Sequence, residues 1–340
     1  MTGDVPTFCR HNHLVQNCPI CAREQQIELR PVLSSGAPRT SASRATPPRE
    51  RSAPTPGAGS GGPRTGSRSG GRLRVRKLAR GAEDGYRSLL APGLRSSADA
   101  DRLAQELAFA TGRLARLESD PPGLYATVGS GAQDIEERTW LAFLITYLCP
   151  LEDQQPFAEI ERVRTSWSSG ESPDLIDAQL GPRGAQDQPG SGRTLEAYRA
   201  WAARVGSQAA SFTGEAGWTP ERRFARAYER LALPGLDRAA RFDLLVTLGR
   251  LGVYELRPAT LALGGDNRVT LGAKRVLGIG DPLLLERRAV ELAQACELPL
   301  EALDLGLDNW EAGTRASLGL GSDAEPAADA LESARSALGL

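Results

Sequence analysis

The chain has 340 residues, of which 40% are hydrophobic and 24% charged, and its formal net charge at pH 7 is -1. No apolar run approaches the roughly 20 residues that a membrane-spanning helix requires, which excludes the class of helical membrane proteins. The N-terminal residues also lack the apolar segment of a secretory signal, so we expect a cytoplasmic protein whose cysteines are reduced.

Groups that bind metals are concentrated in the first 29 residues. Both histidines of the chain and three of its five cysteines lie between positions 8 and 21, in the spacing C-x-H-x6-C-x2-C. Three thiolates and one imidazole suit a closed tetrahedral Zn2+ site, which is structural rather than catalytic. The predicted ligands are Cys9, His11, Cys18 and Cys21, with His13 as an alternative to His11. A redox CxxC pair and a fortuitous cluster are the competing interpretations.

Residues 30–72 are predicted to be a disordered linker. They consist mainly of Ser, Gly, Pro, Thr, Ala and Arg, and they cannot bury enough apolar surface to offset the entropy lost on ordering. From Arg23 to Arg80, thirteen Arg or Lys residues oppose three Glu, which leaves a surplus of ten positive charges. This basic segment would attract a polyanion such as nucleic acid, or else serve only as a solvated tether.

Residues 73–318 are predicted to form one helical domain. Apolar side chains recur every three or four residues over 96–119, and residues 134–150 are apolar on most sides after an acidic first turn. Thr219 followed by Pro220 marks the beginning of another helix. Further helical periodicity covers residues 156–167, 194–212 and 218–233, and a long surface loop is expected over 168–193.

Strand-like alternation is nearly absent, so the predicted fold class is all-α. The one exception that we expect is a β-hairpin around LALGGDNRVTL, residues 261–271, where turn residues separate two short apolar runs. The acidic, Ala-rich residues 319–340 are expected to form a flexible tail, with a frayed helix over 322–340 as the alternative.

A helix-hairpin-helix motif is predicted from AKRVLGIGDPLLLERRAVELA, residues 273–293. Gly278 and Gly280 allow a sharp turn and a close approach of another molecule to the backbone. The free N–H groups at the beginning of the second helix would hold a nucleic-acid phosphate without reading its sequence. The basic side chains expected to assist are Lys274, Arg287 and Arg288. Alternatively, both glycines only terminate one helix and begin the next.

The order of LGIG, a helix and then PLEALD, residues 299–304, resembles the helix-hairpin-helix DNA glycosylase superfamily. The resemblance implies that Asp304 occupies the position of the catalytic aspartate, and that a flipped nucleotide enters a pocket between helical halves. Asp281 and Pro282 stand where lyase-active members carry a lysine, so Schiff-base chemistry is not expected. From the residues alone, Asp304 and Asp308 could equally form a solvated helix face.

Over about residues 86–310 the chain looks more closely like the alpha-glutamyl/putrescinyl thymine pyrophosphorylase family, clade 3. The segments that carry this likeness are TYLCPLEDQQPFAEI, FDLLVTLGRLGVYELRP and AKRVLGIGDPLLLERRA. The resemblance implies a reaction on DNA in which an amine or amino acid displaces pyrophosphate from a modified thymine. No four-cysteine cluster follows Trp310, so the iron-sulfur cluster of some relatives is not expected.

The leading functional hypothesis is a nucleoid-associated, DNA-acting, glycosylase-like enzyme that recognises or processes a thymine-derived base in duplex DNA. The predicted zinc module and basic linker would then add nonspecific affinity for DNA. The first alternative is a non-catalytic nucleic-acid-binding or adaptor protein on the same helical scaffold. A further alternative is a protein-binding zinc module joined to a helical assembly platform.

Overall fold

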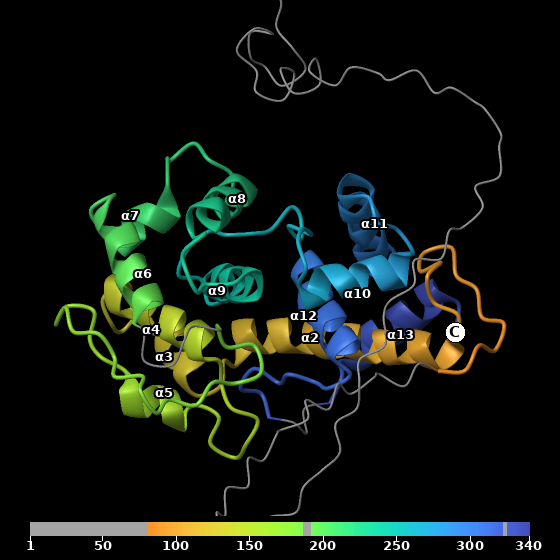
Figure 1. Ribbon diagram of the computed structural model, residues 1–340, viewed down its shortest axis with the longest axis horizontal. Helices are drawn as coiled ribbons and strands as arrows, with labels where there is room; N and C mark the ends of the chain where they lie inside the picture. The colour runs from red at the N-terminus through yellow and green to blue at the C-terminus, as the bar shows by residue number, and fades with distance from the viewer. Residues whose placement is uncertain (1–80, 186–191, 322–324) are drawn as a thin grey trace, which may run out of the picture. The chain divides into compact units, whose positions relative to one another are not determined.

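The structure, a computed structural model, describes residues 81–185, 192–321 and 325–340. All described residues belong to one unit, Leu73–Leu340. The predicted zinc ligands and the linker over 30–72 lie outside the described residues. Every regular element of the described residues is a helix, which confirms the all-α fold class (Figure 1). The helices are α2 Ser97–Ser119, α3 Leu124–Gly129, α4 Ile135–Leu148, α5 Ala158–Val163, α6 Arg193–Ala203, α7 Gln208–Thr213, α8 Pro220–Arg230, α9 Arg238–Arg250, α10 Arg268–Leu277, α11 Pro282–Ala295, α12 Leu300–Ala312 and α13 Ala328–Leu338.

The long helix α2 supports α12, which carries the predicted catalytic residue. The two helices pack against each other. Their backbones approach closely at Gly306, where a Cβ atom would lie 2.7 Å from a side-chain methyl of Leu107 and 3.2 Å from its Cα. The apolar face predicted for α2 is buried against this contact, and each buried leucine contributes about 1.5 to 3 kcal/mol. Its leucines are Leu103, Leu107, Leu114 and Leu117.

The helix α4 is buried from Thr139 to Leu148, as its nearly continuous apolar sequence predicts. Its first turn is capped by Asp134, whose side chain accepts a hydrogen bond of 2.7 Å from the N–H of Glu136. The helix ends at Leu148, and the following Cys149 has a φ of 60° just before Pro150. This helix contacts α3, α5, α7 and α9.

The expected β-hairpin over residues 261–271 is wrong. No strand occurs in the described residues, and α10 begins inside this stretch, with the side chain of Asn267 accepting a hydrogen bond from the N–H of Thr270. The carboxylate of Glu286 on α11 accepts hydrogen bonds from the N–H groups of Leu261 and Leu263. A side chain thus satisfies the backbone groups that a partner strand would have satisfied.

The C-terminal segment also differs from the expected flexible tail. Helix α13 packs along α2, and Ala334 and Leu338 on one of its faces are fully buried. The backbone carbonyl of Leu338 accepts a hydrogen bond of 2.5 Å from the hydroxyl of Tyr86. An apolar stripe at helical spacing is therefore sufficient to dock this alanine-rich segment.

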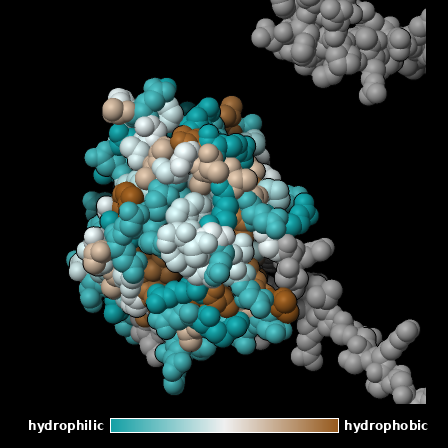
Figure 2. Space-filling view, turned by 90° about the vertical axis from the view of Figure 1, so that its left-hand side faces the viewer, coloured by the Kyte–Doolittle hydropathy of each residue, from teal (hydrophilic) through white to brown (hydrophobic). Residues whose placement is uncertain are grey.

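The face seen in Figure 2 is mainly hydrophilic, with small and separate hydrophobic areas. None of the helices in the described part of the chain combines the length and hydropathy that a bilayer crossing requires.

Candidate functional site

Two helices joined by a short turn, as predicted around LGIG, are present. Helix α10 ends at Leu277, and Gly278 then adopts a φ of 65° in the left-handed region, where a side chain costs about 1 to 2 kcal/mol. Helix α11 begins at Pro282 after the N-cap residue Asp281. A tight turn forms between the two helices because a glycine ends the first and Asp-Pro begins the second. We call residues 278–280 the glycine turn.

The turn offers two backbone donors to a ligand. The N–H groups of Ile279 and Gly280 donate to no acceptor in the described residues, and no heavy atom lies within 4 Å of a Cβ built on Gly280. Asp281 restricts this site, because its carboxylate accepts a hydrogen bond of 2.9 Å from the N–H of Leu284. An anion at the turn would therefore contact the glycine segment rather than the first turn of α11.

The predicted basic residues near the turn are only partly available. Arg287 and Arg288 both pair with Glu291, at 3.0 and 2.6 Å, and these contacts lower the pKa of Glu291. Arg288 also donates a hydrogen bond of 2.7 Å to the carbonyl of Leu89. Lys274 is half-buried on α10. Binding of a polyanion here would exchange the Glu291 pairs for phosphate contacts.

The segment around Gly93 packs against the end of α10 and the glycine turn. The N–H of Gly93 donates a hydrogen bond of 2.9 Å to the carbonyl of Val276, in the last turn of α10. A Cβ on Gly93 would lie 1.8 Å from the carbonyl oxygen of Arg275 and 2.8 Å from the nitrogen of Gly278. Gly93 is therefore required because two backbones meet at this point.

Asp304, the predicted catalytic residue, lies in a buried cluster of five charged side chains, which we call the Arg183 cluster. Its members are Arg183, Arg238, Asp243, Asp304 and Asp308. The guanidinium nitrogens of Arg183 lie 2.9 Å from an oxygen of Asp243 and 2.9 Å from an oxygen of Asp304. A third nitrogen lies 3.0 Å from Asp308, and Arg238 binds the second oxygen of Asp304.

The cluster excludes one of the two interpretations of Asp304 and Asp308. These residues are 1% and 2% exposed, so the solvated helix face is wrong. Both lie one turn apart on the inner face of α12. Asp308 also pairs with Arg268 at 3.1 Å, and Arg268 is the first residue of α10. The first helix of the hairpin is thereby connected to the Arg183 cluster.

Sequence reasoning missed Arg183, which lies in the stretch expected to be a surface loop. The N–H groups of Gly181 and Ala185 donate hydrogen bonds of 2.9 and 2.8 Å to the carbonyls of Leu148 and Tyr147 at the end of α4. This anchoring directs Arg183 inward. Burial lowers the pKa of Arg183, but the three carboxylates outweigh burial and raise it well above its ordinary value. The arginine therefore stays charged.

Asp243 and Arg113 line a small cavity beside the cluster. The cavity has a volume of about 10 Å³, which is room for one water molecule, and Thr247 and Cys149 also contribute to its wall. Burial raises the pKa of Asp243, and this effect exceeds the opposing influence of Arg183 and Arg113. The buried Nε of Arg113 has no hydrogen-bond partner among the described residues.

Among the described residues, neither the glycine turn nor the Arg183 cluster provides a set of metal ligands. No group of three or more His, Cys, Asp or Glu side chains in residues 81–185, 192–321 and 325–340 is arranged to hold a metal ion. The two cysteines in these ranges, Cys149 and Cys296, are buried free thiols, and burial raises their pKa values to about 12 and about 11.

Comparison with known proteins gives a family model that matches part of the chain. The family model of alpha-glutamyl/putrescinyl thymine pyrophosphorylase, clade 3, matches residues 183–312, in agreement with the resemblance seen in the sequence. The matched segment begins at Arg183 and includes the glycine turn and Asp304. It is shorter than the span of about 86–310 over which the resemblance was noted. No curated protein and no solved structure matches the chain.

Proposed function

From the match of residues 183–312 to the alpha-glutamyl/putrescinyl thymine pyrophosphorylase family, clade 3, we propose that the protein binds duplex DNA and recognises or processes a thymine-derived base. The observation that supports this most is the glycine turn with two unused N–H donors, joined through α10 to the Arg183 cluster. The turn would hold a backbone phosphate and position the helical domain on DNA, without contributing sequence specificity.

In the proposed enzyme, Asp304 orients the nucleophile or stabilises positive charge that develops on the sugar. Its ionised form is needed for either role, and two arginines keep it beside permanent positive charge. Both carboxylate oxygens are engaged, however, so a substrate reaches Asp304 only if Arg183 or Arg238 withdraws. The glycosylase-like role therefore requires an opening of the Arg183 cluster when DNA binds.

The same burial favours the second candidate function, a non-catalytic DNA-binding or adaptor protein. A carboxylate that is 1% exposed and held by two arginines is an ordinary structural arrangement. One scaffold can serve both functions, so the fold does not distinguish them.

Mass spectrometry of nucleosides tests the proposed enzyme. DNA that contains 5-hydroxymethyluracil or a related thymine derivative is incubated with the intact protein and an amine or amino acid donor. The modified nucleoside is expected to be released or converted by the intact protein, and to persist with Asp304→Asn. An unchanged profile together with DNA binding would support the non-catalytic function.

The matched control is Asp308→Asn, because Asp308 also lies on α12 and also pairs with Arg183. Each variant neutralises a buried carboxylate that makes two ion pairs, and the unfolding of the two variants is compared first by urea titration. Equal losses of activity at equal stability would assign Asp304 a structural role. A loss confined to Asp304→Asn would place it in the reaction.

The zinc module remains a proposal, because Cys9, His11, Cys18 and Cys21 lie outside the described residues. We expect about one zinc ion per chain by metal analysis of the purified protein. Cys21→Ser should lose the metal, whereas Cys296→Ser should retain it, because Cys296 belongs to the helical core. Equal zinc content in both variants would refute the proposed ligand set.

A further inference from the structure

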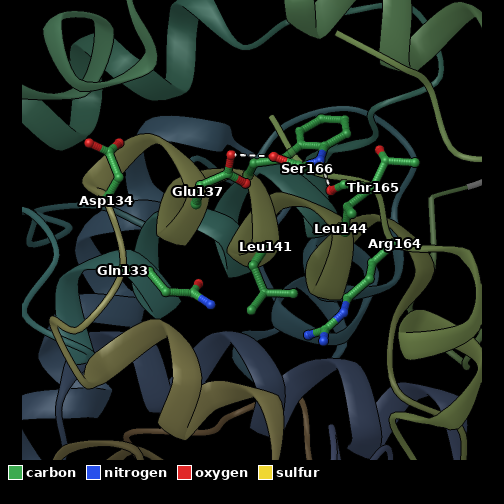
Figure 3. A pocket seen from close by; sticks show the side chains of 9 residues that line it. Gln133, Asp134, Glu137, Leu141, Leu144, Arg164, Thr165 and Ser166 are labelled. Atoms are coloured by element: carbon green, nitrogen blue, oxygen red, sulfur yellow. Dashed lines mark hydrogen bonds between the residues drawn. The ribbon is translucent and has the colours of Figure 1, made fainter. Parts of the chain in front are cut away.

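A pocket in the described part of the chain lies beside residues 137–144 of α4, outside the family-matched segment. Its volume is about 450 Å³, within the range of small-molecule sites. The floor consists of the buried side chains of Trp140, Leu141 and Leu144 on α4. The rim consists of Gln133, Asp134 and Glu137 on one side and residues 164–166 on the other (Figure 3).

Side chains of α4 hold the side of the rim that residues 164–166 form. The indole nitrogen of Trp140 donates a hydrogen bond of 2.9 Å to the carbonyl of Thr165. The carboxylate of Glu137 accepts hydrogen bonds from the hydroxyl of Ser166 at 2.5 Å and from the N–H groups of Trp167 and Ser168 at 2.9 and 3.0 Å. The pocket is therefore formed before any ligand arrives, which lowers the entropic cost of binding.

The two carboxylates on the rim, those of Asp134 and Glu137, already accept hydrogen bonds from protein groups. Asp134 caps α4, and Figure 3 shows its carboxylate directed away from Leu141. Burial raises the pKa of Glu137, but its hydrogen bonds with Ser166 and the following residues outweigh burial and lower it. Glu137 therefore remains ionised, and protein donors surround its carboxylate.

Gln133 and Arg164 are the free polar groups of the pocket. Neither side chain makes a hydrogen bond or ion pair with any residue in the described ranges. In Figure 3 the amide of Gln133 and the guanidinium of Arg164 extend from opposite sides toward the space beside Leu141. A ligand that lies on this leucine could contact both groups.

The free groups offer more donors than acceptors. A guanidinium provides five N–H donors and no acceptor, and an amide provides two donors and one carbonyl acceptor. The Thr165 hydroxyl is directed to the carbonyl of Glu171, at 3.0 Å. The complementary ligand is flat, rich in carbonyl acceptors and supplied with one N–H donor. An imide pyrimidine has two carbonyl groups on either side of one N–H, and its ring can pack on the apolar floor.

We propose that this pocket binds an imide pyrimidine, with Gln133 facing the imide edge and Arg164 donating to a ring carbonyl. The choice of thymine among imide rings rests on the proposed function, whereas the pocket and its donors do not. The site would hold a thymine-type nucleoside separately from the DNA contact at the glycine turn.

Isothermal titration of the full chain with thymidine tests the proposal. We expect saturable binding that is weakened at least about tenfold by Arg164→Gln and by Gln133→Leu, since each removes a direct hydrogen bond. Methylation of the ring nitrogen N3 of thymidine should weaken binding in the same way. The control is Arg162→Gln, because Arg162 is exposed, pairs with Glu159 and does not line the pocket. That variant should bind like the intact protein.

Thymidine 5′-monophosphate and inorganic phosphate form the other arms of the titration. Binding of the two phosphate compounds without thymidine would overturn the proposal and identify an oxyanion site at Arg164. Absence of binding by all three, or equal affinity in all variants, would overturn it as well. Free thymidine requires neither DNA nor turnover, so failure of this proposal is distinguishable from failure of the proposed function.

Discussion

Replacing Arg183 by methionine is expected to lower the free energy of unfolding by about 3 to 5 kcal/mol, because it removes one partner from buried ion pairs. Three carboxylates that share this guanidinium would remain buried with reduced compensation. Urea unfolding at pH 7, followed by circular dichroism, measures the difference between the two proteins.

The control for this substitution is Arg226→Met, which removes an exposed pair with Glu229 on α8. Such surface pairs contribute about 0 to 1 kcal/mol. A loss in Arg183→Met no larger than in the control would contradict the structural importance of the cluster. Burial already raises the pKa of Asp243, and loss of Arg183 should raise it further. A raised folded-state pKa favours the folded state at low pH, so the deficit should shrink as pH falls through that pKa.

Gly93→Ala is expected to destabilise the helical domain by about 3 kcal/mol, through overpacking that a side-chain rotation cannot relieve. The new methyl group would overlap the backbone carbonyl of Arg275. Because this contact supports the end of α10, affinity for DNA should fall together with stability. Gly217→Ala is the control, since no heavy atom lies within 4 Å of its Cβ position.

Gly280→Ala separates binding from folding at the same turn. Its Cβ position is open, and its φ lies outside the left-handed region, so stability should be unchanged. If a phosphate approaches the turn, the methyl group should reduce DNA affinity about tenfold, measured by fluorescence anisotropy with a labelled duplex. Unchanged affinity would locate the DNA contact elsewhere on the protein.

The sequence predicted correctly those features of the fold that depend on residues within one helical turn of each other. Thr219 and Pro220 begin α8 as expected, because a cap and a proline act within one turn. Gly278 ends α10 for the same kind of reason. The error at residues 261–271 arose because Glu286, a residue on another helix, satisfies the backbone there.

The candidate site depends on contacts between distant positions, which periodicity does not contain. Arg183 is separated by 60 residues from Asp243 and by 121 from Asp304. The four-residue spacing of Asp304 and Asp308 indicated a shared helix face, but the same spacing is found on solvated and buried faces. Nothing in the local sequence of the loop identified Arg183 as the partner.

Because the Arg183 cluster is buried, salt should weaken its ion pairs much less than it weakens the proposed contacts with DNA. Mobile ions screen exposed charges, but they have little access to side chains that are 1% and 2% exposed. Contacts with DNA phosphates weaken steeply as counterions accumulate. A salt gradient should therefore elute the protein from DNA with its helical domain still folded.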